Sequence, residues 1–511
     1  MAEYSGSFQR QLSLAMATFY IEQFGCRATQ ADAAAIERQL RERGAAPAPG
    51  SAAADVVVVN TCTVTAAADA QAREAIRAIH RRNPAARILV TGCYAQRAPE
   101  ELAALPGVDW VVGNSHKPEI PRLFGELAAQ RSTSPQSSAL VPLTVFDAQP
   151  LAPTRSRSHV EMSLARGPAK ILTGNIFEQA DIFSAPVSGD DAGLDSIAAG
   201  HTRPILKIQD GCNNRCSYCV IPFVRGRSRS LPPNDVLREI RALLAAGARE
   251  IVLSGINLGA WGRDLTPRVE FVDLLKRILD ETSIERLRVS SIEPMDVTRD
   301  LVDLFAATGR VAQHFHIPLQ SGSDRTLAAM HRWYRAEHYA RRVELIGELL
   351  PYAAIGADVI AGFPGETEQD HAATLDFIAR LPFTYLHVFS FSERPGTAAA
   401  NLSSQVAPAI VRRRAHELRA LAAKKSAEFL NAQVGKKMRV LTLHTAAEIA
   451  AKTTDALSSH YLRVRVDGSF PPNAWLDVRV TGREENRLLA DPVSEESLAA
   501  YVSKMTCASA C

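Results

Sequence analysis

The sequence predicts an α/β protein with an N-terminal parallel α/β domain, a central incomplete (βα)6 TIM-like barrel and a small C-terminal antiparallel β-barrel. The first observation is that short apolar runs alternate with amphipathic helical stretches along most of the chain, a pattern typical of parallel sheets covered by helices. The second is that this alternation stops near residue 433, where strand-like segments follow one another without helices. We therefore expect three folded parts.

The N-terminal part, residues 1–125, supplies three strand-like runs, at 17–25, 54–62 and 86–96, with helical patterns between them. Because strands that alternate with helices run parallel, their carboxyl ends meet at one edge of the sheet, where ligands gather in such folds. We expect any functional group of this domain at that edge.

Cys26, Cys62 and Cys93 each lie just past the end of one of these three strands. A single free cysteine is most often a small buried apolar residue. Three cysteines in equivalent positions instead favour a shared metal site, although they are far apart in the sequence.

Residues 126–200 have the Ser, Pro, Gly and charge content of a linker or insertion. Two apolar pieces within this segment, 140–146 and 169–177, could form local strands. We assign no chemistry to the segment.

Residues 201–432 repeat a strand and helix unit, which predicts the incomplete barrel. In a barrel of this kind, functional residues lie in the loops that follow the strands. The strand-like segments are residues 204–209, 249–255, 286–293, 314–320, 355–363 and 385–391.

Residues 433–495 alternate apolar and polar side chains and predict the small β-barrel. Arg and Lys residues flank Tyr461 and Trp475 there, a combination that suits RNA. A purely stabilising β appendage is the alternative. The tail, residues 496–511, carries Cys507 and Cys511, which we expect to be free thiols because chain ends seldom hold a metal site alone.

The 511-residue chain has a formal net charge of +3 and eight cysteines. Eight cysteines are too few for a disulfide scaffold in a chain of this length. The sequence has no long apolar run and its start lacks the pattern of a signal peptide, so we expect a soluble cytoplasmic monomer with no membrane partner.

Cys212, Cys216 and Cys219 form a CxxxCxxC array directly after the first barrel strand. Three thiolates leave one position of a tetrahedral metal open, and on a 4Fe-4S cluster they leave one iron free for another ligand. A zinc site is the alternative, but zinc motifs usually present CxxC pairs and a fourth ligand. We therefore expect a reactive metal centre.

This array and the motifs around it resemble the radical S-adenosylmethionine methylthiotransferases. The resemblance covers the N-terminal cysteine domain, the barrel and a C-terminal TRAM-like RNA-binding β domain, and leaves out residues 126–200. It is carried by NTCTVT, TGCYAQ, KIQDGCNNRCSYCVIPFVRGRSRS, SSIEPMD, HIPLQSGSD, ADVIAGFPGET and FSERPGTAA.

The resemblance implies two 4Fe-4S clusters. One is held by the catalytic Cys212, Cys216 and Cys219, and its free iron chelates S-adenosylmethionine, whose reductive cleavage gives a 5′-deoxyadenosyl radical. The other is held by Cys26, Cys62 and Cys93, and its free iron carries the sulfur to be inserted. An electron donor of the flavodoxin or ferredoxin type and a sulfur source are the implied partners besides tRNA.

Within this family the motifs look most like the branch that methylthiolates carbon 2 of threonylcarbamoyladenosine, next to the anticodon of tRNA. The branch acting on isopentenyladenosine is the alternative. Two further hypotheses are a non-catalytic iron-sulfur protein that binds RNA and a methylthiotransferase that modifies a protein aspartate.

Further candidates follow the barrel strands. The family likeness and their position suggest cofactor binding, against the alternative of ordinary turn or capping residues, for Gly255, Ser291, Glu293, Gln320, Ser321 and Gly362. Four arginines are candidates for RNA contact. For Arg225, Arg227 and Arg229 the alternative is a solvated basic turn, and for Arg394 the alternative is a role in closing the barrel.

Overall fold

The structure is a computed structural model that describes residues 17–131, 169–183, 202–443 and 452–493. Cys507, Cys511 and the apolar piece at 140–146 lie outside the described residues. The chain divides into two compact units, each treated by itself below. The first comprises Met1–Phe24, Ile36–Thr61 and Asp69–Gly174, and the second comprises Gly25–Ala35, Cys62–Ala68 and Asn175–Cys511.

The first unit contains a parallel sheet of six strands in the order β2-β1-β3-β4-β5-β6, which confirms the predicted N-terminal α/β domain. Its central strand VVVVNT is buried at every position, as expected of a strand covered on both faces. The strands are β1 (Thr18–Gln23), β2 (Ala46–Pro47), β3 (Val56–Thr61), β4 (Arg87–Gly92), β5 (Val108–Gly113) and β6 (Lys170–Leu172).

Strand β6 comes from within the segment that we expected to be a linker or insertion. It pairs with β5 through Ile171 and Val111 and forms one edge of the sheet. The apolar piece at 169–177 therefore does form a local strand, as its composition suggested.

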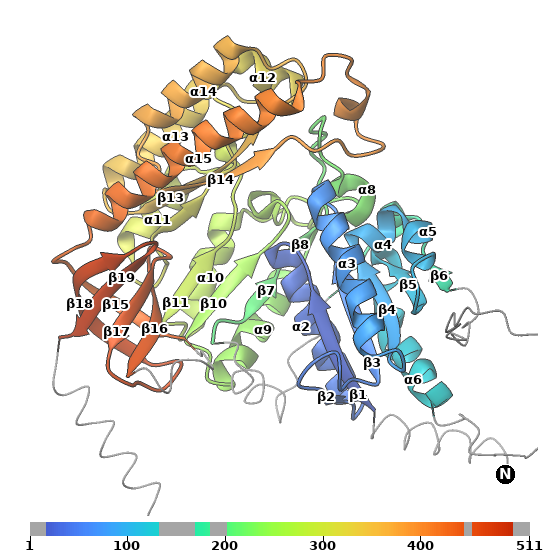
Figure 1. The fold of residues 1–511 in the computed structure, drawn as a ribbon. Helices are drawn as coiled ribbons and strands as arrows, with labels where there is room; N and C mark the ends of the chain where they lie inside the picture. Colours follow the sequence, from blue (N-terminus) through green and yellow to red (C-terminus); the bar gives the residue numbers. More distant parts are fainter. Residues whose placement is uncertain (1–16, 132–168, 184–201, 444–451, 494–511) are drawn as a thin grey trace, which may run out of the picture. The chain divides into compact units, whose positions relative to one another are not determined.

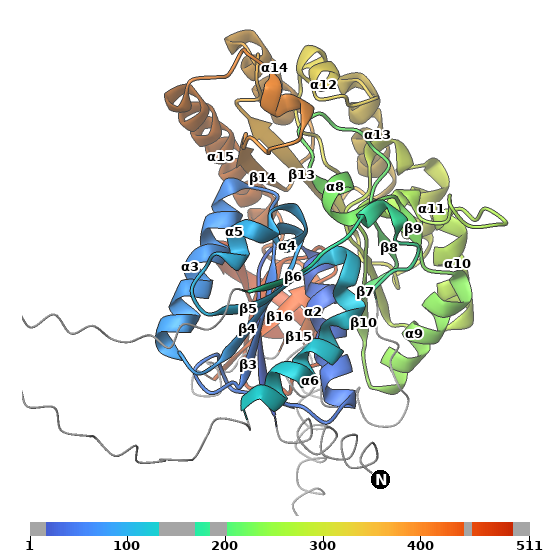
Figure 2. The ribbon, with the colours of Figure 1, turned by 90° about the vertical axis from the view of Figure 1, so that its right-hand side faces the viewer.

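Helices cover both faces of this sheet. Val57 and Val59 point to one face, where they pack with Ile76 of α3. On the other face, Phe124 of α6 meets Phe19 edge to face with ring centroids 6.3 Å apart. Figure 2 shows α3 and α6 on opposite sides of the strands. The helices are α2 (Arg27–Glu42), α3 (Ala66–Arg82), α4 (Cys93–Arg97), α5 (Pro99–Ala103), the 3-10 turn η1 (Asn114–Glu119) and α6 (Ile120–Arg131).

The second unit contains the predicted incomplete barrel, with six parallel strands in chain order. They form two three-stranded sheets, β7-β10-β11 and β12-β13-β14, joined by single bridges from Leu287 to Val311 and from Ser291 to His316. The strands are β7 (Ile205–Lys207), β10 (Glu250–Ser254), β11 (Arg286–Val289), β12 (His314–His316), β13 (Ala354–Ala361) and β14 (Tyr385–Ser390). A short antiparallel pair, β8 (Gln209–Asp210) with β9 (Arg229–Ser230), brackets the cysteine loop.

Helices with strongly amphipathic sequences pack their apolar faces against these strands (Figure 1). In α10, for example, Leu274, Leu275 and Ile278 are fully buried. The helices are α8 (Ile221–Arg225), α9 (Pro233–Ala245), α10 (Phe271–Glu281), α11 (Arg299–Ala307), α12 (Asp324–Ala329), α13 (Ala336–Leu349), α14 (Glu368–Arg380) and α15 (Pro408–Asn431), with 3-10 turns η2 (Ile176–Glu178), η3 (Leu258–Ala260), η4 (Pro294–Asp296) and η5 (Ala398–Asn401). Among the described helices, none is long and apolar enough to cross a membrane.

The chain continues through α15 into a closed five-stranded barrel in the order β15-β16-β17-β19-β18. The prediction of a small β-barrel is confirmed, with the refinement that β17 and β19 pair parallel while the other pairs are antiparallel. Alternate residues such as Val464 and Val466 fill its core. The strands are β15 (Lys437–Thr442), β16 (Thr453–Ser458), β17 (Arg463–Asp467), β18 (Trp475–Glu484) and β19 (Arg487–Pro492).

A buried ionic group fastens this β-barrel to the larger one. The Glu250 carboxylate is fully buried and pairs with Arg288 at 2.7 Å and with Arg286 at 3.3 Å. Arg288 also donates to the carbonyls of Ser458 and Ser459, both at 3.0 Å. One carboxylate therefore holds two arginines in place to bind backbone carbonyls of the smaller barrel.

This group makes the stability depend on pH. Burial would raise the pKa of Glu250, but Arg288, Arg203 and Arg286 lower it from 4.5 to about 2. Since the folded carboxyl has the lower pKa, its contribution is present above the unfolded pKa and is lost as the pH falls toward the folded value. Wild type and Glu250→Gln should differ in their free energy of unfolding, and we expect this difference to shrink as the pH falls from about 5 to about 3. Denaturant unfolding across that range measures it, and a constant difference would contradict the assignment.

Candidate active site

Cys212, Cys216 and Cys219 lie in the loop between β8 and α8, after the first barrel strand. The loop starts at Gly211, which has a φ of +71°. A Cβ at this position would lie 2.0 Å from the carbonyl oxygen of Arg227, so only glycine fits here. The Cys212 amide donates to the Gly226 carbonyl at 3.1 Å, and the Cys219 amide donates to the Cys216 carbonyl at 3.1 Å. The backbone therefore closes the loop on itself.

The three thiols lie close enough to affect one another's ionisation. Burial, with a further contribution from the charge of Cys216, raises the pKa of Cys212 to about 11 and that of Cys219 to about 12. Three thiolates thus destabilise one another here unless a cationic group lies among them. This donor set fits an iron-sulfur cluster, which needs cysteine thiolates and supplies the positive charge.

Arg332, which no sequence pattern singled out, contacts this loop. Its Nη1 donates to Cys216 Sγ at 3.3 Å, and its Nη2 donates to the carboxylate of Glu293. Burial raises the pKa of Glu293, and Arg332 partly offsets that effect. Arg332 therefore links the predicted Glu293 to Cys216.

Gly255 and Gln209 fit together beside the same loop. A Cβ on Gly255 would lie 2.9 Å from Gln209 Oε1, so only glycine leaves room for that side chain. Gln209 accepts from the Asn257 amide at 2.8 Å and donates to the Gly211 carbonyl at 2.7 Å. Gln209, also missed by sequence reasoning, ties the loop after β10 to the start of the cysteine loop.

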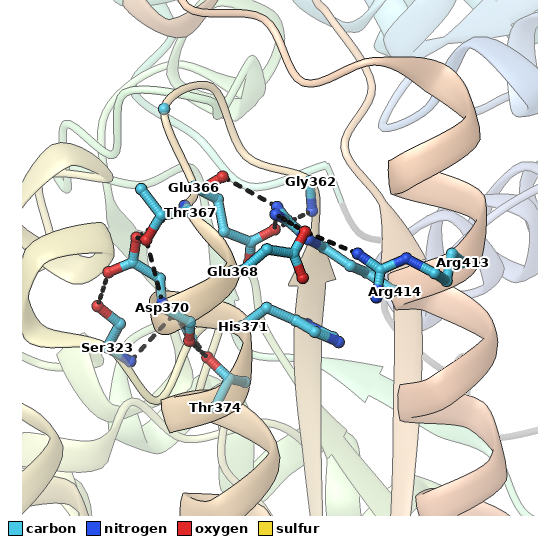
Figure 3. Close-up of polar contacts among 12 residues, drawn as sticks. Ser323, Gly362, Glu366, Thr367, Glu368, Asp370, His371, Thr374, Arg413 and Arg414 are labelled. Atoms are coloured by element: carbon cyan, nitrogen blue, oxygen red, sulfur yellow. Dashed lines mark hydrogen bonds and ion pairs between the residues drawn. The ribbon is translucent and has the colours of Figure 1, made fainter.

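Gly362 belongs to a rigid turn after β13 (Figure 3). Its φ is +78°, and its amide donates to Glu366 at 2.7 Å. Arg414 of α15 donates to the same carboxylate at 2.8 Å. The turn is therefore held by a buried ion pair.

A second set of contacts in Figure 3 fixes the loop after β12. Asp370 accepts from the Thr367 amide at 2.8 Å and from the Ser323 hydroxyl at 2.7 Å. The fully buried Ser321 in turn accepts from the Ser323 amide at 3.2 Å. Two predicted cofactor loops are thus bound to each other through Asp370.

A cavity of about 180 Å³ borders the cysteine loop within the second unit. Its wall is mainly apolar, with Tyr218 and Phe389, and includes Cys219. The polar residues Gln320 and Asp358 also line it. The cavity thus offers a largely apolar space beside the predicted cluster.

The structure separates the four candidate arginines. Arg225 is 2% exposed and pairs with Asp32 and Asp210, each at 3.0 Å. Arg229 and Arg394 are also buried, the latter donating to the Thr63 carbonyl at 3.4 Å. Arg227 is exposed. Three of the four arginines thus have partners inside the protein, and one faces solvent.

Of the other three cysteines, Cys26 and Cys62 belong to the second unit, where Cys62 lies against the glycine that precedes Cys26. Gly25, directly before Cys26, has a φ of +101°, and a Cβ there would lie 2.5 Å from Cys62 Cβ. In the first unit, Cys93 begins α4 directly after β4, and Asn114 donates to its sulfur at 3.6 Å. Each cysteine follows the end of a strand, as the sequence predicted.

Known proteins resemble the chain along most of its length. Residues 18–113 match the model described as "Uncharacterized protein family UPF0004", and residues 206–378 match the "Radical SAM superfamily". The chain is 33% identical over 448 residues to the threonylcarbamoyladenosine tRNA methylthiotransferase MtaB of Aquifex aeolicus, covering 88% of this chain and 96% of that protein. It is 35% identical to the protein of the same name from Bacillus subtilis, covering 81% and 82%.

A second group of relatives carries another name. The tRNA-2-methylthio-N(6)-dimethylallyladenosine synthase of Paenarthrobacter aurescens is 32% identical, covering 94% of this chain and 86% of that protein. Each of these relatives covers more than four fifths of this chain. The chain therefore belongs to the radical S-adenosylmethionine tRNA methylthiotransferase family, transferases that use S-adenosylmethionine and iron-sulfur clusters.

Proposed function

We propose that the protein attaches a methylthio group to carbon 2 of threonylcarbamoyladenosine next to the anticodon of tRNA. The observation that carries the proposal is the cavity that borders Cys219, in a chain whose relatives in Aquifex and Bacillus are named for this substrate. Since tRNA is the substrate, we infer that the protein works in the cytoplasm.

In this proposal Cys212, Cys216 and Cys219 hold one 4Fe-4S cluster, to which S-adenosylmethionine binds, and Cys26, Cys62 and Cys93 hold the second. The unactivated aromatic C–H bond at carbon 2 is beyond side-chain acids and bases, and the bound cofactors supply the radical chemistry that it needs. The largely apolar wall, which includes Tyr218 and Phe389, limits the contact of the reacting atoms with water.

Residues around the cysteine loop and the cavity hold this arrangement in place. Gln209 and Gly255 fix the cysteine loop against the loop after β10. Glu293 orients Arg332, which donates to the Cys216 sulfur. Gln320 lines the cavity, whereas Ser321 and Gly362 stabilise the loops that form its surroundings. For tRNA contact, we propose the exposed Arg227 together with the C-terminal β-barrel, a TRAM-like domain.

Mass analysis of nucleosides from cells lacking the gene tests the function. We expect threonylcarbamoyladenosine without its methylthio group, and restoration of the modified form by the wild-type gene. The purified, reconstituted enzyme should modify an anticodon stem-loop that contains threonylcarbamoyladenosine. If those cells retain the methylthio form, the proposed substrate is wrong.

Isopentenyladenosine is the second candidate substrate. The Paenarthrobacter relative, which is named for dimethylallyladenosine, matches 94% of this chain. A stem-loop containing that nucleoside, assayed in parallel, separates the two. Turnover of this stem-loop alone would favour the second candidate.

The contact between Arg332 and Cys216 predicts a shift in cluster potential. Hydrogen bonds to cluster sulfurs stabilise the more negative, reduced state. We expect Arg332→Gln to lower the potential by roughly 65 mV, since a hydrogen bond to a charged group contributes about 1.5 kcal/mol and 59 mV corresponds to a tenfold change for one electron. A redox titration followed by electron paramagnetic resonance measures it, with the exposed Arg335→Gln as control. An unchanged potential in Arg332→Gln would refute this role.

A further inference from the structure

Three side chains on adjacent barrel strands form a compact group outside the cysteine sites: His316 on β12, Asp358 on β13 and His387 on β14. Their nearest nitrogen and oxygen atoms all lie within 4.8 Å of one another. In the part of the chain that the structure describes, no other three histidine, cysteine or acidic side chains come this close. The proposed function assigns them no role.

The separations within the group suit a metal ion. His316 Nε2 and His387 Nδ1 each lie 3.2 Å from the same oxygen of Asp358, Oδ1. Ligand atoms that share an ion at bond lengths of about 2.0–2.2 Å are separated by roughly 3 Å or slightly more. The three donors therefore need little movement to share one ion.

The orientation of His316 provides a second, independent observation. Its Nδ1 lies 2.7 Å from the Ser291 hydroxyl, and its ring stacks on Tyr385 with an interplanar angle of 14°. Its Nε2 is buried and has no hydrogen-bond partner among the described residues. A metal-bound histidine has this arrangement, because one nitrogen is held by a neighbouring group while the other is left for the ion.

The alternative is a cluster held by hydrogen bonds alone. His387 does hydrogen-bond to Asp358, whereas His316 Nε2 lies 3.2 Å from the same carboxylate oxygen but outside hydrogen-bond geometry. A carboxylate oxygen that two imidazole nitrogens approach at 3.2 Å, one of them outside hydrogen-bond geometry, favours a shared cation.

We propose that His316, Asp358 and His387 bind one divalent transition-metal ion, such as Mn²⁺, Fe²⁺ or Zn²⁺. Two imidazoles and one carboxylate are a donor set that these ions accept, and three protein ligands leave coordination positions open. Asp358 also lines the cavity that borders Cys219, so the open positions suit an oxygen-bearing ligand in that cavity. This last step rests on the proposed function: the oxygen-bearing ligand of the metal ion is the N6 substituent of threonylcarbamoyladenosine, which is rich in oxygen.

Mn²⁺ binding to the reconstituted holoenzyme tests the site without tRNA or turnover. Mn²⁺ prefers nitrogen and oxygen over thiolate ligands, and free Mn²⁺ gives a sharp paramagnetic resonance signal at room temperature that is lost on binding. We expect one Mn²⁺ per chain with submillimolar affinity. His387→Ala should abolish this binding, and its partly exposed side chain makes misfolding a small concern. Asp358→Asn should have the same effect.

Two further variants sharpen the test. Ser291→Ala should weaken binding about 10- to 100-fold, the usual effect of losing a group that orients a metal ligand. His331→Ala, an exposed histidine outside the group, should bind Mn²⁺ like wild type. The proposal is overturned if wild type binds no Mn²⁺, or if His387→Ala and Asp358→Asn bind it equally well. Because tRNA is absent, a wrong substrate assignment would leave these results unchanged.

Discussion

Cys216→Ala is expected to abolish methylthiolation while the chain retains about four of the eight irons that two 4Fe-4S clusters would contain. Cys216 is central to its loop, because its charge adds to burial in raising the pKa of both Cys212 and Cys219, and because its sulfur accepts from Arg332. Loss of one of three thiolate ligands leaves two irons of that cluster without a protein ligand. Iron analysis and single-turnover assays on anaerobically reconstituted protein measure the two effects.

The matched control is Cys507→Ala, which makes the same chemical change in the tail. It should retain all the iron and full activity. Full activity of Cys216→Ala would refute the radical mechanism. Loss of all iron in Cys216→Ala would show that the two proposed clusters do not assemble independently.

Glu250→Ala is expected to have the largest effect on stability. The substitution leaves Arg286 and Arg288 buried without their carboxylate, and both also bind carbonyls of the small β-barrel. Removing one partner of a buried ion pair costs about 3–5 kcal/mol. We expect the midpoint of urea unfolding to fall and limited proteolysis to release the C-terminal barrel more readily than in wild type.

Glu281→Ala is the control for this prediction. Its carboxylate pairs with Arg277 and Arg241 on the surface, where all three side chains are exposed. Because solvent screens such pairs, we expect a change within about 0.5 kcal/mol. Equal unfolding midpoints for Glu250→Ala and wild type would show that the ionic group does not hold the two barrels together.

Local patterns were enough to predict the fold class. The run VVVVNT is buried on both faces, as its composition indicated, and the repeat of strands and helices gives the six barrel strands in chain order. The switch to alternating residues near 433 marks the small barrel. The one parallel pair within it, β17 with β19, was not predicted, because strand alternation specifies which face is buried and not which strand pairs with which.

The partners of the candidate arginines could not be predicted from the local sequence. RGRSRS reads as a basic turn, yet Arg225 pairs with Asp32, 193 positions earlier in the chain. Lys207 and Asp210 complete this buried group. Charge in a sequence does not reveal its partner, and only the tertiary structure shows which arginine is neutralised inside and which is free to meet a phosphate.

The sequence by itself predicted a metal centre at the cysteine loop, because Cys212, Cys216 and Cys219 lie within eight consecutive residues and supply three thiol ligands without a fourth nearby. Only the tertiary structure decided what surrounds that loop. Arg332 lies 116 positions from Cys216, and His316, Asp358 and His387 come from three different strands. Such contacts depend on how strands pair and helices pack, and those long-range interactions leave no periodic signal in the chain.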